Sequence, residues 1–256
     1  MIKLRILGGH GGISLGFRGT SYLIDETLLI DAGGVVDSLT IEEQLKIDHI
    51  LISHPHLDHI KDLAFISDNC FGVKSSPFEV FSSVGTREAI KNHLMNDQIW
   101  PDFTKLPTVE KPTIRLHIFE PDKVLHIKEY KILPILVNHP GMACGFIIEK
   151  GNAAILFTQD TGPTFEIWEK AKSFKNLKAI FSEVSFPNEL KYVAKLSCHH
   201  TPQTIDEEIK KMPANIPIYL GHIKPNYQPV ILKEMAELNN NRIQLLEKDD
   251  LFFEFK

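Results

Sequence analysis

Apolar residues recur along this chain in short runs bounded by glycine, proline or polar positions. Runs of this kind are typical of buried strands, whereas apolar residues spaced three or four apart indicate helices. The pattern predicts strands over residues 2–7, 21–24, 28–31, 49–52, 79–81, 114–119, 130–137, 143–149, 153–158, 179–181, 216–220, 243–246 and 252–255. It predicts helices over residues 41–46, 86–95, 163–174, 202–212 and 228–238, and another that starts near His59. Residues 97–113, interrupted by prolines, are expected to form an ordered loop.

The order of these elements predicts an α/β fold. Two β-rich halves are each followed by helices, which suggests two sheets packed face to face with helices outside. The 256 residues fit one large domain, and no linker, low-complexity segment or fixed-period repeat divides them. We therefore expect a single domain over residues 1–256.

Composition narrows the range of partners. Hydrophobic residues make up 43% of the chain, enough for a sizeable core, and the net charge is −5. No run of Lys and Arg suggests a nucleic-acid groove, so a long nucleic acid is not an expected partner. No apolar stretch of about 20 residues is present, so no membrane span is expected. The three cysteines are far apart and odd in number, which, with no signal-peptide pattern, favours a cytoplasmic location.

The segment His54-Pro55-His56-Leu57-Asp58-His59 is the richest in chemistry. Packing does not require three histidines and a carboxylate in six positions, since such residues are rarely placed together unless something neutralises them. The segment follows the predicted strand 49–52 and therefore lies on a loop. Imidazole nitrogens and carboxylate oxygens are zinc-type ligands. On such a loop, His54 and His56 can bind one ion while Asp58 and His59 reach a second.

Three other predicted strands are followed by a residue of the same kind. His139 follows strand 130–137, Asp160 follows 153–158 and His222 follows 216–220. Each alone is a weak signal, because a histidine there is more often a surface residue and Asp160 could cap a helix, although Thr161 could supply that cap. Together they indicate the ligands that one loop cannot provide for two metal sites. The two oxygens of Asp160 also suit it to bridge two metals.

Residues 53–62 resemble the HxHxDH motif of the metallo-β-lactamase fold. More narrowly, residues 54–60 resemble the signature of class II cyclic-nucleotide phosphodiesterases. The similarity continues at residues 92–94, 99–101, 160–163, 185–188, 199–202 and 221–225. The chain departs from the family pattern at Asp62, Asp68 and Cys198, which affects the expected substrate preference more than the metal chemistry.

This resemblance implies a metallo-β-lactamase-like, four-layer αββα sandwich of two mixed β-sheets with helices outside. It also implies two Zn²⁺ ions, with Mn²⁺ or Fe²⁺ as alternatives at one position. The implied ligands are His54, His56 and His139 for one ion and Asp58, His59 and His222 for the other, with Asp160 as the bridge.

The implied reaction is hydrolysis of 3′,5′-cyclic nucleotides, cyclic AMP or cyclic GMP or both, to nucleoside 5′-monophosphates by attack of a zinc-bridging hydroxide. A small-molecule cyclic nucleotide is thus the expected partner. A homodimer is compatible with this interpretation.

His199 and Glu183 are expected to take part in catalysis beside Asp58. The leaving 3′ oxygen needs a proton or a metal, and His199 lies at a predicted helix start, where it could donate one. Glu183 follows strand 179–181 and could hydrogen-bond the other ring nitrogen of His199. The pair resembles the Glu–His acid of the tRNA 3′-processing ribonucleases. The alternative is that His199 caps or packs locally, with His200 as a weaker candidate acid and substrate contact.

Two aromatic residues in loop 97–113 are candidates for substrate binding. The rings of Trp100 and Phe103 offer flat faces on which a purine could stack. The alternative is that both rings belong to the core.

Two other classes of function remain open. One is a different hydrolase with the same metals, such as an RNA-processing nuclease, a thioester hydrolase or a lactamase, since fold does not imply function. A nuclease is expected to carry a protruding basic arm, and the sequence contains none. The other is a non-enzymatic metal-binding domain, which is expected to lack one or more ligands.

Overall fold

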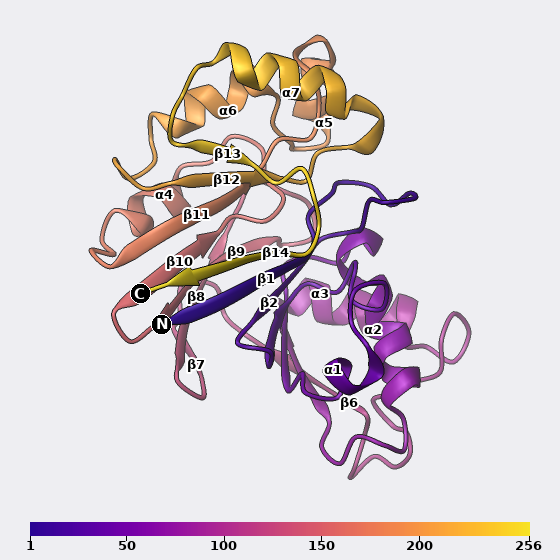
Figure 1. The fold of residues 1–256 in the computed structure, drawn as a ribbon. Helices are drawn as coiled ribbons and strands as arrows, with labels where there is room; N and C mark the ends of the chain where they lie inside the picture. The colour runs from indigo at the N-terminus through magenta and orange to yellow at the C-terminus, as the bar shows by residue number, and fades with distance from the viewer.

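The apolar runs form two seven-stranded sheets, and the computed structural model describes residues 1–256 (Figure 1). In spatial order, the first sheet consists of β14 (Leu251–Phe255), β1 (Ile2–Gly8), β2 (Ser21–Ile24), β3 (Leu28–Ile30), β4 (His49–Ile52), β5 (Phe78–Ser82) and β6 (Ile114–Ile118). The second consists of β13 (Ile243–Leu245), β12 (Ile218–Gly221), β11 (Leu177–Glu183), β10 (Ala153–Phe157), β9 (Cys144–Lys150), β8 (Tyr130–Leu136) and β7 (Leu125–Ile127).

Both sheets are mixed. Strands β3 to β6 are parallel to one another, as are β10 to β13, and the other neighbours are antiparallel. The chain termini lie side by side, because β1 pairs with β14 in a register that places Ile2 opposite Phe255 (Figure 1). Parallel strands point their carboxyl ends at one edge of a sheet, so the loops that follow β3, β4, β10, β11 and β12 gather at one end of the molecule.

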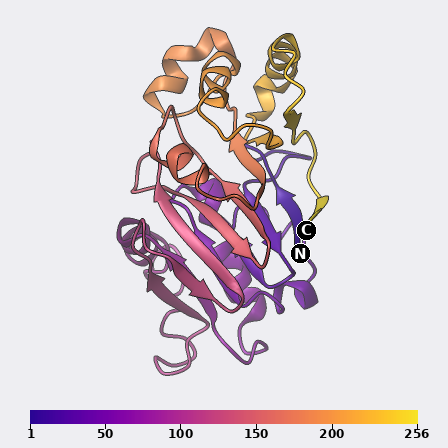
Figure 2. The same cartoon turned by 90° about the vertical axis from the view of Figure 1, so that its left-hand side faces the viewer.

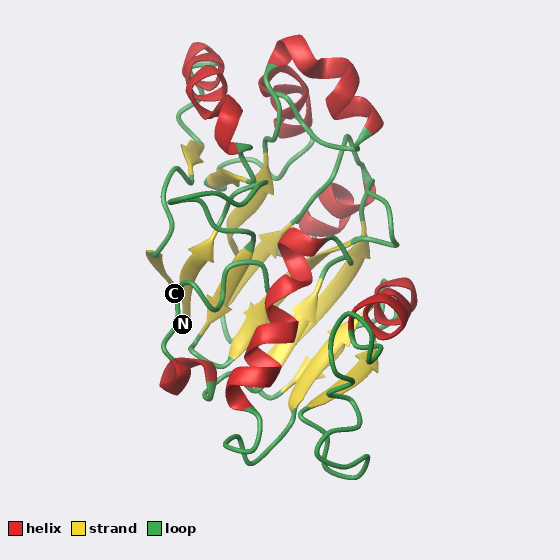
Figure 3. Ribbon diagram, turned by 90° about the vertical axis from the view of Figure 1, so that its right-hand side faces the viewer, coloured by secondary structure: helices red, strands yellow, loops and turns green.

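Helices cover the outer face of each sheet. The first sheet carries α1 (Ile41–Gln44), α2 (Leu57–Cys70), α3 (Val84–Ala89) and the π-helical turn Ile90–Leu94. The second carries α4 (Glu166–Ala171), α5 (Lys191–Leu196), α6 (Pro202–Ile209) and α7 (Gln228–Glu237), with 3₁₀ turns at Asn188–Leu190 and Pro225–Tyr227. Figure 2 shows α4 in front of the second sheet, and Figure 3 shows the long α2 lying across the first.

Three apolar clusters hold these layers together. One lies between the sheets and includes Phe146, Phe157 and Phe181, all almost fully buried. The other two lie between each sheet and its helices, with Leu63 of α2 in one and Trp168 of α4 in the other. Two sheets face to face with helices outside, as expected, give the four-layer αββα sandwich. No helix combines the length and apolarity needed to cross a membrane.

Several element boundaries differ from those predicted. The helix expected over residues 86–95 is α3 continued by the π-helical turn, and the one expected over 163–174 shortens to α4. Strand β7 and helix α5 were not predicted, because each is short and has partly polar flanks. The capping role considered for Asp160 or Thr161 is wrong, since α4 begins at Glu166 and the Thr161 hydroxyl instead accepts a hydrogen bond from the Asn138 N–H (3.2 Å).

Candidate metal centre and active site

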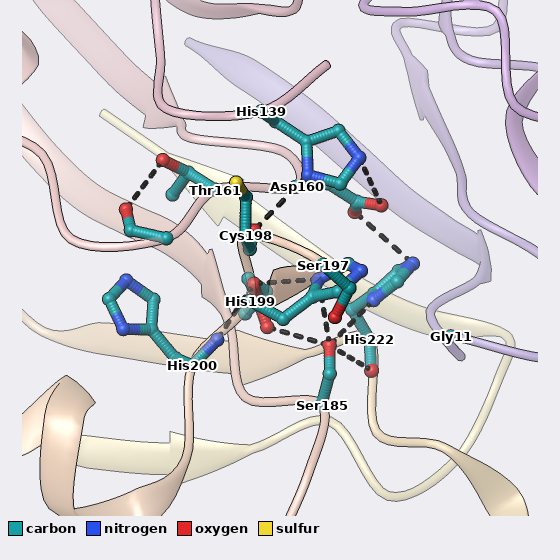
Figure 4. A network of polar contacts seen from close by, with 12 residues as sticks. Gly11, His139, Asp160, Thr161, Ser185, Ser197, Cys198, His199, His200 and His222 are labelled. Atoms are coloured by element: carbon teal, nitrogen blue, oxygen red, sulfur yellow. Dashed lines mark hydrogen bonds and ion pairs between the residues drawn. The ribbon is translucent and has the colours of Figure 1, made fainter. Parts of the chain in front are cut away.

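The residues expected to bind metal come together at the carboxyl ends of strands from both sheets. The loop after β4 brings the segment 54–59, and α2 begins within that segment, at Leu57. From the second sheet, the loop after β8 supplies His139, the loop after β10 supplies Asp160 and the loop after β12 supplies His222. Figure 4 shows His139 and His222 on either side of Asp160.

These side chains form two groups that share Asp160. The first contains His54, His56, His139 and Asp160, and the second contains Asp58, His59, Asp160 and His222. Within each group, one potential ligand atom per residue lies within 4.8 Å of all the others. The grouping is the same as the one that the sequence resemblance implies.

The Asp160 carboxylate is the point on which the rings converge. Its Oδ2 lies 3.6 Å from His54 Nε2, 3.3 Å from His59 Nε2 and 4.0 Å from His139 Nε2. Its Oδ1 lies 3.1 Å from His222 Nε2. Oδ2 therefore faces histidines of both groups and Oδ1 faces His222, so the carboxylate lies between the two groups.

The ring nitrogens that face the middle of the centre lack hydrogen-bond partners within the protein, and a bound cation would provide one. The Nε2 atoms of His54, His59 and His222 are buried and make no hydrogen bond. A buried polar atom without a partner is costly, and each of these atoms points at a shared carboxylate, so divalent cations would satisfy them. Asp58 and His56 lie on the more exposed side, which leaves this side of the centre open to solvent.

Without metal, burial and the neighbouring charged groups shift the pKa values of the residues in the centre. Burial lowers the pKa of His54 well below its usual value, and it lowers that of His139 to about 4. Burial acts in the same direction on His59, but the carboxylates of Asp160 and Asp31 outweigh it and hold the His59 pKa well above its usual value. For Asp160, the surrounding histidines overcome the effect of burial and keep the pKa well below the usual range. The lowered pKa values of His54, His139 and Asp160 favour neutral rings beside an ionised carboxylate, as metal binding requires, whereas His59 has to give up a proton to bind a metal.

The outward-facing ring nitrogens are held by residues to which the sequence analysis assigned no such role. His59 Nδ1 lies 2.7 Å from Asp31 Oδ2, His54 Nδ1 lies 3.0 Å from Ser53 Oγ and His222 Nδ1 lies 2.9 Å from Ser185 Oγ. His139 Nδ1 donates to the Cys198 carbonyl (3.1 Å). Such partners fix the orientation and tautomer of a ligating histidine.

Asp31 is the most heavily used of these partners. Its buried carboxylate contacts His59 and also accepts hydrogen bonds from the Ser53 N–H, the Ser53 hydroxyl and the Gln159 side-chain amide, each at 2.7 Å. Asp31 follows β3, so its position at a strand end was a usable signal. The contact with Gln159 also joins the first sheet to the loop that carries Asp160.

His199 and Glu183 form the pair that the sequence suggested. Glu183 is the last residue of β11, and its Oε1 accepts a hydrogen bond from His199 Nδ1 (3.0 Å). Burial lowers the pKa of His199, but the adjacent Glu183 carboxylate outweighs it and raises the net value. The His199 ring stacks on that of His222, with 5.3 Å between centroids, which places it beside the second ligand group.

His200 points away from this centre. Its ring is fully buried, lies 3.2 Å through Nδ1 from the Thr204 hydroxyl and is turned away from His199 and His222 in Figure 4. The expectation that His200 contacts substrate or serves as the acid is therefore wrong. Its backbone N–H does contribute, by donating to Glu183 Oε1 (3.2 Å).

The aromatic residues of loop 97–113 pack against α2. Phe103 is 3% exposed and meets Phe71 at the end of α2, so the expectation that its ring stacks on substrate is wrong. From Asp58 to Phe71, α2 rises about 1.5 Å per residue, so Phe103 lies about 20 Å from the metal-binding end of the helix. The partly buried Trp100 ring packs edge-on against Phe65, nearly two turns along the helix from Asp58. Both aromatics belong to the packing of the outer core.

Comparison with known proteins agrees with this geometry. The family model described as a beta-lactamase superfamily domain matches residues 27–222, which include the whole seven-residue set. The chain belongs to the beta-lactamase superfamily. A probable 3′,5′-cyclic-nucleotide phosphodiesterase of Yersinia pestis is 26% identical, over 95% of this chain and 87% of that protein. The 3′,5′-cyclic-nucleotide phosphodiesterase 1 of Saccharomyces cerevisiae is 30% identical over 34% of this chain and 24% of its own length.

Solved structures show the same superfamily fold. Unliganded yeast PDE1 superposes with a TM-score of 0.80 at 18% identity, covering 97% of this chain and 98% of that one. The metallo-beta-lactamase fold protein YhfI from Bacillus subtilis gives a TM-score of 0.77 at 19% identity, covering 99% and 100%. The resemblance to the phosphodiesterase branch of this superfamily, noted in the sequence, is thus confirmed, and the chain carries the hydrolase fold of that superfamily.

Proposed function

We propose that this chain is a metal-dependent phosphodiesterase that hydrolyses 3′,5′-cyclic nucleotides, cyclic AMP or cyclic GMP or both, to nucleoside 5′-monophosphates. The observation that carries the proposal is the placement of the His199–Glu183 pair beside a ligand set in which every expected residue is present. The names of the relatives in Yersinia pestis and Saccharomyces cerevisiae support the same substrate class.

Two Zn²⁺ ions are the proposed cofactors. His54, His56 and His139 would hold one and Asp58, His59 and His222 the other, with Asp160 shared. Bound there, divalent cations supply charge stabilisation for a phosphoryl group and an activated water near neutral pH. The chain's own contribution is to hold the seven ligands in two adjoining groups and to keep one side open, where His56 is exposed.

His199 is the proposed general acid. Breaking the ring of a cyclic nucleotide leaves an alkoxide at the 3′ oxygen, which departs poorly without a proton. Glu183 occupies Nδ1 of His199, so the proton available for transfer is on Nε2, which makes no hydrogen bond within the chain. The Glu183 carboxylate also favours the charged form of His199, as the raised pKa of His199 indicates. Glu183 therefore orients the acid and keeps it protonated.

Replacing His199 tests this function. His199→Ala is expected to lower kcat on cyclic AMP by a factor of about 10²–10⁴, because a positioned acid typically contributes that much. The loss is expected to shrink on a nitrophenyl phosphodiester, whose leaving group is stable without a proton. Glu183→Gln is expected to show the same pattern more weakly. His199→Ala is expected to keep about two metal equivalents, measured by elemental analysis.

Three results would contradict the proposal. Equal losses on both substrates would assign His199 to phosphate binding instead of proton transfer. Loss of metal in His199→Ala would place it among the ligands. Wild-type protein that cleaves a pre-tRNA but neither cyclic AMP nor cyclic GMP would assign the centre to RNA processing.

A cytoplasmic location is part of the proposal. All three cysteines, Cys70, Cys144 and Cys198, are free in the structure. Free thiols are the usual state in a reducing compartment.

A further inference from the structure

One buried hydroxyl joins the proposed acid to the proposed metal centre. Ser185 Oγ lies 2.7 Å from Glu183 Oε2. The same atom lies 2.9 Å from His222 Nδ1 and 3.3 Å from His199 Nδ1 (Figure 4). It also lies 3.1 Å from the His222 carbonyl oxygen. Ser185 is fully buried, so no solvent competes for these contacts.

The hydroxyl has only one proton to donate, and the shortest contact decides where it goes. Glu183 Oε2 is the closest acceptor, and a hydrogen bond to an ionised carboxylate is stronger than one to a neutral partner. The Ser185 oxygen is then an acceptor toward both rings. Its contact with His222 is a hydrogen bond only if His222 Nδ1 carries the proton.

This arrangement determines which His222 nitrogen is free. A neutral imidazole with its proton on Nδ1 has a lone pair on Nε2. His222 Nε2 lies 3.1 Å from Asp160 Oδ1 and 3.4 Å from Asp58 Oδ2, on the side of the proposed metals. The lone pair therefore points where a cation would bind.

We propose that Ser185 is a positioning residue that holds His222 in the tautomer able to bind metal, and that it does so with a proton anchored on Glu183. The inference rests on the proposed metal centre. It makes Glu183 a shared anchor, because one oxygen orients the acid His199 and the other, through Ser185, orients the ligand His222.

The effect is confined to one of the two metal positions. The Nδ1 atoms of His54 and His139 are held by Ser53 and by the Cys198 carbonyl, without Ser185. Loss of the Ser185 hydroxyl therefore weakens the group of Asp58, His59, Asp160 and His222 and spares the group of His54, His56 and His139.

Titration of metal-free protein with Zn²⁺ against a chelator of known affinity tests this inference. For Ser185→Ala, one of two Zn²⁺ equivalents is expected to bind about 10–100-fold more weakly, as is typical when the partner of a ligating histidine is removed. The other equivalent is expected to stay within about 2-fold of wild type. Ser185→Thr, which keeps a hydroxyl, is expected to restore the affinity. Ser67→Ala, which removes a buried hydroxyl bonded only within α2, is the matched control and is expected to change neither.

A second measurement needs no variant at Ser185. Long-range proton–nitrogen NMR spectra of the metal-free wild type report the tautomer of His222, and the Nδ1–H form is expected. The Nε2–H form would overturn the inference, as would equal weakening of both equivalents in Ser185→Ala or failure of Ser185→Thr to rescue. None of these readouts uses a substrate. A wild type inactive on cyclic nucleotides would therefore overturn the proposed function alone.

Discussion

At the scale of single residues, the centre depends on two glycines as much as on its ligands. A Cβ added at Gly33 would lie 1.7 Å from the Asp58 carbonyl oxygen, and one added at Gly19 would lie 2.7 Å from the same atom. These positions therefore accept no side chain unless the start of α2 moves. The chain after β3 packs directly against the backbone of a proposed metal ligand.

Gly33→Ala is expected to displace Asp58 and to destabilise the protein by about 1–3 kcal/mol or more, as overpacking in a rigid site does. The number of Zn²⁺ ions bound per chain measures the displacement, and the thermal unfolding temperature measures the destabilisation. Both values are expected to fall. Gly9→Ala is the matched control, because its Cβ would meet nothing closer than a methyl group of Ile6 at 3.5 Å. A Gly33→Ala protein with normal stability and two tightly bound metals would contradict this account.

The grouping of the proposed ligands could be predicted from sequence, but their supporting partners largely could not. His139, Asp160 and His222 each follow an apolar run, so pattern alone placed them at strand ends. Ser185 has no such mark, because a serine after a strand is common and its role depends on a contact with His222, 37 residues away. Asp31 was the last residue of a predicted strand, yet nothing local shows that Ser53, His59 and Gln159 reach it.

At the scale of elements, the first residues of α2 contribute to the proposed metal centre and do little to stabilise the helix. Its N-cap is His56, which makes no capping hydrogen bond, whereas Ser or Thr at that position usually stabilises a helix by about 1 kcal/mol. The ring lies instead against His139, with Nδ1 3.3 Å from His139 Nε2. Asp58 in the first turn compensates in part, since a carboxylate there favours the helix dipole. Stability of α2 must therefore come mainly from its sides.

Trp100 supplies part of that lateral support, so Trp100→Ala is expected to act on stability and not on substrate binding. Removing a partly buried ring that packs on Phe65 is expected to cost about 1–3 kcal/mol, less than the value for a fully buried Trp. Denaturant unfolding measures this loss, and KM for cyclic nucleotides is expected to stay within about 2-fold. Ile99→Ala, at a neighbouring position that is 66% exposed, serves as the control. A raised KM with unchanged stability would restore the stacking role for Trp100.

Two of the wrong predictions have a common physical cause. Residues 163–165 fit a helical pattern, but other segments hold the chain here, since Asn138 Nδ2 donates to the Pro163 carbonyl (3.0 Å) and the Thr164 N–H donates to Glu208 Oε2 (3.3 Å). Helix α4 therefore starts only at Glu166. The sequence suggested that loop 97–113 could reach a substrate, but the rings of Trp100 and Phe103 are instead buried against α2, where removal from water stabilises them. In both cases tertiary packing overrode a local pattern, which a single sequence does not encode visibly.

At the scale of the whole molecule, the two sheets are joined at both ends. At the functional end, Gln159 reaches across to Asp31. At the opposite end, Asp25, in the turn between β2 and β3, accepts hydrogen bonds from Tyr130 Oη (2.6 Å) and Lys150 Nζ (3.0 Å) of the second sheet. Asp25 also accepts from the Lys3 N–H (3.0 Å). This partly buried contact joins the two sheets far from the proposed metals.

The ionised form of Asp25 should make stability depend on pH. Burial raises its pKa, but the hydrogen bonds from Tyr130, Lys3 and Lys150 and the charge of Lys150 outweigh it, so the folded pKa is below the usual value. A carboxyl with a lowered folded pKa contributes stability above its unfolded pKa of about 3.9 and loses it as pH falls through the folded value. Asn is the informative substitution, because it also tolerates the left-handed backbone of this position (φ 47°).

Asp25→Asn is therefore expected to lower the free energy of unfolding at pH 7 by about 1–2 kcal/mol, the scale of hydrogen bonds to a charged group. The difference from wild type is expected to stay constant down to about pH 5 and to shrink as the pH falls below the unfolded pKa of about 3.9 toward the lower folded value, through which the folded carboxyl takes up its proton. Denaturant unfolding of metal-free protein across this range measures it, since acid would otherwise strip the metals as well. Glu26→Gln, an exposed neighbour paired with Lys46, is the control and is expected to change little at any pH. A difference in the free energy of unfolding that stayed undiminished down to pH 3 would show that the Asn side chain disturbs the turn itself, and that charge is not what joins the sheets there.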